Sequence, residues 1–127
     1  MLEKFPYCIP CQRELSSEER DIVGFILERE APHRLFELDT LKVVARCGCG
    51  QCPTILFGTS LNEEPNTKHP FNEIATYFGR NPEGDLVGVM LIDCDGRLSE
   101  LEVYSLEGVE IRSWPEITSL TNNTNNL

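Results

Sequence analysis

The segment CGCGQC at positions 47 to 52 contains three cysteines, Cys47, Cys49 and Cys52. Glycines between the cysteines let the backbone curl, so that the three thiolates can converge on one point. Zinc is the metal that proteins most often bind with clustered thiolates. The sequence therefore predicts a zinc site with Cys47, Cys49 and Cys52 as ligands.

A tetrahedral zinc site needs a fourth ligand. The first candidates are Cys8 and Cys11, which form a Cys-x-x-Cys pair near the start of the sequence. His33, His69 and Cys94 are less obvious candidates. The spacing of the cluster as a whole is not that of a zinc ribbon or a zinc finger. A second hypothesis therefore stays open, in which the cysteines are small reduced residues of a tight turn and bind no metal.

A pair of glutamates offers a different chemistry. Glu100 and Glu102 alternate with Leu101 and Val103, so both carboxylates project from one face of a predicted strand. Two such carboxylates can in principle act as an acid and a base. Because no histidine or nucleophile lies near them in the sequence, we expect a water-exposed strand face, and we predict no catalytic residue.

One helix is predicted to begin after Ser16. Ser16 and Glu19 have the Ser-x-x-Glu spacing of a capping box, in which each side chain binds a free backbone amide. Apolar residues such as Ile22 and Ile26 follow at helical spacing, which predicts a stripe that packs on a core. Pro32 is expected to end the helix.

Alternating apolar residues and turn signals predict about five strands. They cover residues 41–46, 54–57, 73–78, 86–93 and 97–104, and a short edge segment is expected at 109–111. The strand at 86–93 is apolar on both faces and should lie in the middle of the sheet. Residues 1–15 are expected to be an irregular lead-in, because Pro6 and Pro10 oppose regular structure. Residues 60–70 are expected to be a surface loop.

The predicted fold class is therefore α+β. It consists of an antiparallel β-meander of about five strands, with the N-terminal helix packed on one face. Residues 1–115 are expected to form a single domain. Residues 116–127 are expected to be a disordered polar tail, because they are too polar to pack.

The composition limits the partners of the protein. Its 127 residues carry a formal net charge of −10, and its 11 basic residues form no block, so we expect no nucleic-acid partner. A basic protein is an easier partner electrostatically. No apolar run approaches the length of a membrane span, and the first residues do not resemble a signal peptide. We therefore expect a cytoplasmic protein with reduced cysteines and no membrane contact.

Two segments carry a resemblance to a known family. They are VARCGCGQCPTILF, which ends at Phe57, and DGRLSELEVYSLEG at positions 95 to 108. Together they resemble a family of short uncharacterised bacterial proteins, a domain of unknown function. That family combines a Cys-x-Cys-Gly-Cys turn with a Leu-Ser-Glu-Leu-Glu-Val-Tyr strand. Gln51 is inserted relative to the first motif. The resemblance implies a common domain and no activity.

Small size, acidity and the absence of a catalytic constellation favour a non-enzymatic interaction protein. By analogy, bacterial immunity proteins that neutralise basic toxins have this general character. The alternative is a zinc-binding module that uses the clustered cysteines.

Overall fold

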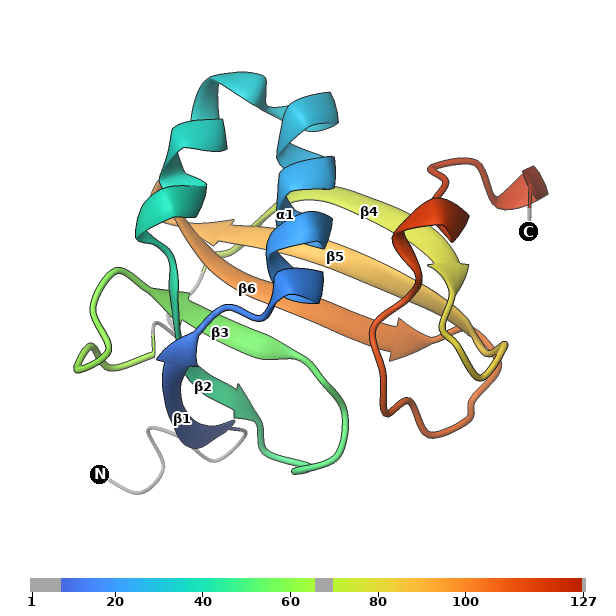
Figure 1. The fold of residues 1–127 in the computed structure, drawn as a ribbon, viewed down its shortest axis with the longest axis horizontal. Coiled ribbons are helices and arrows are strands. Elements are labelled where there is room, and N and C mark those ends of the chain that lie inside the picture. Colours follow the sequence, from blue (N-terminus) through green and yellow to red (C-terminus); the bar gives the residue numbers. More distant parts are fainter. Residues whose placement is uncertain (1–7, 66–69, 127) are drawn as a thin grey trace.

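The computed structural model describes residues 8–65 and 70–126 (Figure 1). The elements follow in the order β1 (Cys8–Glu14), α1 (Ser17–Glu30), the 3₁₀ helix η2 (Pro32–Thr40), β2 (Lys42–Cys47), β3 (Ile55–Gly58), β4 (Asn72–Arg80), β5 (Leu86–Cys94), β6 (Arg97–Ser105), and the short 3₁₀ turns η3 (Ile117–Ser119) and η4 (Thr124–Asn126). The predicted α+β class and the antiparallel sheet are confirmed. The described sheet has six strands, where about five were predicted.

The strands lie in the order β1-β2-β3-β6-β5-β4, and every neighbouring pair is antiparallel. The sheet is thus two three-stranded meanders, joined where Ile55 of β3 pairs with Leu101 of β6. The prediction of one continuous meander is wrong. The connection after β3 carries the chain to the far edge of the sheet, so the last strand returns beside β3. Strand β5 is an interior strand, but it lies beside the edge strand β4, and β3 and β6 occupy the middle of the sheet where β5 was predicted.

Strand β1 is the strand that the sequence analysis missed. Residues 8–14 were expected to be irregular, but they pair with β2 from Cys8 opposite Cys47 to Glu14 opposite Lys42. A proline is tolerated there because β1 is an edge strand, and one side of an edge strand needs no amide partners. The register is irregular between Pro10 and Arg13. Residues 1–7 lie outside the described part of the chain, and the segment at 109–111 forms no strand.

Helix α1 begins with the predicted capping box. The Glu19 amide donates to Ser16 Oγ at 3.2 Å, and the Ser16 amide donates to Glu19 Oε1 at 2.8 Å. The helix ends at Glu30, and Pro32 opens η2 instead of a loop.

One apolar cluster holds these elements together. Ile22, Val23, Ile26 and Leu27 of α1 are buried in the same cluster as strand residues, among them Val43, Phe57, Val89, Leu91 and Leu101. Figure 1 shows α1 and η2 on the same side of the sheet.

The region expected to be a polar tail makes contacts along β4. Phe78 and Thr121 exchange two backbone hydrogen bonds, of 2.7 and 2.8 Å. The Ser119 hydroxyl also accepts a hydrogen bond from the Arg80 amide at 2.9 Å. No helix in the described ranges is long and apolar enough to cross a membrane.

Candidate metal centre

The three clustered cysteines lie where β2 gives way to the turn before β3. Cys47 is the last residue of β2, and its amide donates to the Thr54 carbonyl at 3.0 Å, which closes the turn. Gly50 donates its amide to the Cys47 carbonyl at 3.1 Å and has a φ of 74°. A side chain at position 50 would be strained by that φ, so this glycine is what lets the turn fold back.

This turn brings three sulfur atoms together. The Sγ atoms of Cys47, Cys49 and Cys52 all lie within 4.8 Å of one another. Two thiolates on one tetrahedral zinc are roughly 3.8 Å apart, since each zinc–sulfur bond is about 2.3 Å long. The sulfurs can therefore reach one ion with a small adjustment of their side chains. Cys47 and Cys52 are half-buried and Cys49 is exposed, so the cluster opens to solvent.

Backbone amides stabilise a negative charge in the cluster. The amides of Gln51 and Cys52 both point at Cys49 Sγ, at 3.4 and 3.2 Å. Because these hydrogen bonds favour the thiolate, they lower the pKa of Cys49 to about 7. Burial raises the pKa of Cys47 to about 12, and the neighbouring thiols contribute to the rise. Cys49 is therefore the more acidic of these two thiols, and a divalent cation bound to the cluster would favour the thiolate form of its ligands.

The structure separates Cys8 from Cys11. Cys8 pairs with Cys47 across the β1–β2 ladder, so both side chains project from the same face. Cys11 is packed against the apolar core on the helix side, where its thiol interacts with Arg13. Neither belongs to the group of sulfurs within 4.8 Å. Of the two, only Cys8 is on the face from which it can approach Cys47.

The less obvious ligand candidates lie elsewhere. Cys94 is buried at the end of β5, and His33 lies in η2. His69 lies outside the described residues. Within residues 8–65 and 70–126, the group of Cys47, Cys49 and Cys52 is the one cluster of three or more potential ligands.

The two glutamates of β6 do not form the water-exposed face that was expected. Glu100 and Glu102 are half-buried, and they pair across β5 with Ile92 and Met90. Burial, together with the charge of Glu102, raises the pKa of Glu100 to about 7. Burial also raises the pKa of Glu102. Apolar side chains of β5 lie beside the pair, and the Cys8 thiol lies near Glu100: burial, and after it the charge of Glu100, raises the pKa of Cys8.

A short hairpin turn joins β5 to β6. Asp95 and Gly96 have φ values of 55° and 78°, as expected for a two-residue hairpin turn.

Sequence reasoning missed one signal in the cysteine cluster. Cys49 and Cys52 are themselves a Cys-x-x-Cys pair, the spacing at which the amides two and three residues after the first cysteine can donate to its sulfur. The spacing was visible in the sequence, but the third cysteine at position 47 obscured it.

No family model, curated protein or solved structure matches this chain. The resemblance to short bacterial proteins with a Cys-x-Cys-Gly-Cys turn therefore stays a prediction.

Proposed function

We propose that this protein binds one zinc ion through Cys47, Cys49 and Cys52. The observation that carries the proposal is the convergence of three sulfurs within 4.8 Å in a turn whose amides already stabilise a thiolate. Thiolate ligands suit zinc better than magnesium or calcium, which prefer oxygen. A zinc ion held there would fasten the turn between β2 and β3 and act as a structural site.

We further propose Cys8 as the fourth ligand. Its position opposite Cys47 on the same face supports this choice, whereas Cys11 is packed on the helix side of the sheet. Cys8 needs a change of side-chain rotamer to join the group, since its sulfur lies outside the 4.8 Å cluster.

The test is titration of the reduced, metal-free protein with cobalt, which reports thiolate ligation as charge-transfer absorption, followed by competition with zinc. Cys47→Ser, Cys49→Ser and Cys52→Ser should each weaken binding by about 100-fold or more. Cys8→Ser should weaken it by about 10-fold, while the matched variant Cys11→Ser, from the other face of the same strand, should not. Cobalt spectra without thiolate bands would overturn the zinc proposal. Equal affinities for Cys8→Ser and Cys11→Ser would overturn the assignment of the fourth ligand.

A second candidate function is that of an acidic interaction protein that binds a basic protein. The formal net charge of −10 favours it, and the likeness to immunity proteins is one of general character only. We propose the cytoplasm as its location, because all six cysteines are free of disulfides.

Pull-down from a host lysate at low and at moderate salt tests the proposed binding of a basic protein. Recovery of a basic protein at low salt that is lost at moderate salt supports it, and recovery of no partner under either condition contradicts it.

A further inference from the structure

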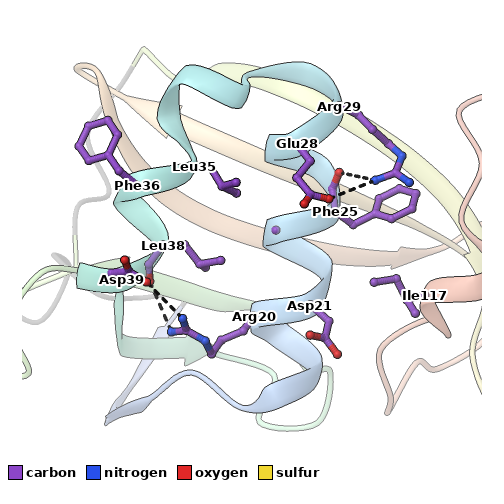
Figure 2. Close-up of a pocket in the computed structure, with 11 residues that line it drawn as sticks. Arg20, Asp21, Phe25, Glu28, Arg29, Leu35, Phe36, Leu38, Asp39 and Ile117 are labelled. Carbon is purple, nitrogen blue, oxygen red and sulfur yellow. Dashed lines mark hydrogen bonds and ion pairs between the residues drawn. The ribbon is translucent and has the colours of Figure 1, made fainter.

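A groove of about 730 Å³ runs between α1 and η2 (Figure 2). Its apolar lining comes from both helices and from η3: Phe25, Leu35, Phe36, Leu38 and Ile117. Helix α1 has 14 residues, which corresponds to a length of about 21 Å. The lining covers only Arg20 to Arg29 of this helix, a length of about 14 Å, which corresponds to between two and three turns of a docked helix.

Gly24 is the residue of the groove lining that has no side chain. Gly24 lies on the side of α1 that faces η2, and a Cβ built there would come within 3.5 Å of Leu38 Cδ2. In a helix interior, glycine costs about 1 kcal/mol relative to alanine. A Cβ at 3.5 Å is an ordinary van der Waals contact, so an alanine would fit at position 24, whereas a longer side chain would extend into the groove.

Two large apolar side chains in the groove lining are exposed to solvent. Phe36 is 73% exposed and Ile117 is 37% exposed. Exposure of a phenylalanine forgoes about 2 kcal/mol of hydrophobic stabilisation. Apolar surface that is concentrated in a groove with a polar rim is typical of a protein-binding site.

Acidic side chains dominate the exposed charge at the rim. The side chains of Asp39 and Glu28 are 85% and 62% exposed, and those of Arg20 and Arg29 are less exposed, at 45% and 48%. Arg29 lies over the Phe25 ring, 3.5 Å from its centroid. Arg20 lies 3.6 Å from Asp39. Arg29 also lies 3.9 Å from Glu28, so each arginine pairs with one of these two carboxylates.

Asp21 adds a third carboxylate to the lining of the groove. Among the described residues it has no ion-pair partner. The lining thus carries three carboxylates and two guanidinium groups, and Asp21 is the carboxylate left to attract a cationic ligand.

We propose that this groove binds a basic amphipathic helix of another protein, with apolar anchors beside Phe36 and Leu38 and lysines or arginines against the acidic rim. The proposal rests on the second candidate function, and it names the surface and the chemistry of the partner. Helices that dock in grooves do so through apolar anchors spaced three and four residues apart. The proposed binding at the groove does not depend on the zinc site.

The test uses a fluorescein-labelled peptide of leucine and lysine, about 18 residues long, whose leucines share one helical face. Binding is followed by fluorescence anisotropy at about 150 mM salt, where weak surface attraction is screened. A peptide of the same composition in scrambled order is the ligand control. Analytical ultracentrifugation of the free protein reports whether it self-associates.

Two variants address the groove. Phe36→Ser removes an exposed anchor, and Gly24→Leu fills the space beside Leu38. Each should weaken binding of the peptide by about 10-fold or more. The matched control is Val109→Ser, because Val109 is 45% exposed and lies outside the groove lining. It should leave the affinity unchanged. Circular dichroism checks that each variant is folded. If Gly24→Leu does not fold, Phe36→Ser still provides the test.

Two further variants address the charge. Asp21→Lys should weaken binding about threefold more than Glu83→Lys, which makes the same charge change at the β4–β5 turn.

Equal affinities of the wild type, Phe36→Ser and Gly24→Leu for the peptide would contradict binding in the groove. They would not contradict the proposed function as an acidic interaction protein. No difference between the amphipathic and scrambled peptides would also contradict binding in the groove. A dimer of the free protein that Phe36→Ser dissolves would overturn the proposed occupant, because a second copy would then fill the groove.

Discussion

Cys49 and Cys47 differ strongly in acidity although they lie two residues apart in the same cluster. Two amides aimed at Cys49 Sγ lower the pKa of that thiol to about 7, and burial raises the pKa of Cys47 to about 12. The amides are fixed by the turn around Gly50, so they are in place before any ligand arrives. This arrangement favours a ligand that supplies positive charge to the whole cluster, which is what a divalent metal does.

Glu100 gives the protein a pH dependence of stability. Its pKa is about 7 in the folded protein because of burial and the charge of Glu102, against 4.5 for an ordinary glutamate. The folded state therefore holds this proton more tightly than the unfolded state. The free energy of unfolding should fall as the pH rises from about 4.5 to about 7, and the loss should be complete above that range.

The variant Glu100→Gln tests this dependence. It should be more stable than the wild type at pH 8 by about 1 to 2 kcal/mol, after allowance for solvent screening of a half-buried group. At pH 4 the two proteins should be equally stable. Urea unfolding at both pH values measures the difference, and Glu116→Gln on an exposed position is the control. The explanation fails if Glu100→Gln and the wild type lose stability in parallel between pH 4 and pH 8.

At the scale of single residues, the sequence identified the cysteine cluster but not the state of Glu100. Clustered thiols separated by glycines can be recognised from spacing alone. Strand alternation shows only that Glu100 and Glu102 share a face. Whether that face is exposed to water depends on the groups that cover it and on the neighbouring strands, which can come from distant parts of the chain. In this protein, Leu56 of β3 is paired with Glu100.

Among the elements, η2 is attached to the sheet by an arginine as well as by the packing of Leu35 and Leu38 against the core. Arg34 donates to Glu37 within η2 at 2.7 Å, to Asp93 at the end of β5 at 2.6 Å, and to the Gly96 carbonyl at 3.0 Å. The side chains of Arg34 and Asp93 are only 17% and 7% exposed, so this ion pair is shielded from solvent. The planar guanidinium can satisfy all three acceptors at once, which a lysine ammonium at the same place cannot.

Arg34→Lys should therefore lower the free energy of unfolding by about 2 kcal/mol, because Asp93 keeps its charge in a buried place with fewer partners. Hydrogen exchange should accelerate in η2 more than in α1. Urea unfolding measures the first effect and mass spectrometry the second. Arg20→Lys is the control, since Arg20 forms an exposed pair with Asp39 and its replacement should cost at most about 0.5 kcal/mol. A cost for Arg34→Lys no larger than this control would contradict the role of Arg34.

At the same scale, local patterns predicted the elements and failed on their arrangement. The capping box at Ser16 and the alternating strands of the second half were predicted because their signals are local. Strand β1 was missed because Pro10 was interpreted as opposing regular structure. Proline is tolerated in an edge strand such as β1, where its missing amide need not pair with another strand. The pairing of β3 with β6 joins residues about 45 positions apart. No local sequence pattern, such as a turn motif, predicts a pairing over that distance.

For the whole molecule, the excess of acidic residues has a cost in stability. The protein has 21 acidic and 11 basic residues, so its folded state concentrates negative charge. Salt screens this repulsion, and the Debye length falls from about 30 Å at 0.01 M to about 8 Å at 0.15 M. The melting temperature should rise by roughly 2 to 5 °C over this range.

Differential scanning calorimetry in sodium chloride and in sodium fluoride measures this shift and separates screening from chloride binding. Equal rises in both salts support screening. A melting temperature that stays constant or falls would show that charge repulsion contributes little to the folded state.

The zinc content of the whole protein tests the central claim most directly. The protein is purified under reducing conditions without chelator, and zinc is measured by elemental analysis beside the triple variant in which Cys47, Cys49 and Cys52 are replaced by serine. We expect about one zinc per wild-type chain and almost none in the variant. Less than about a tenth of an equivalent in the wild type would contradict the proposed metal centre.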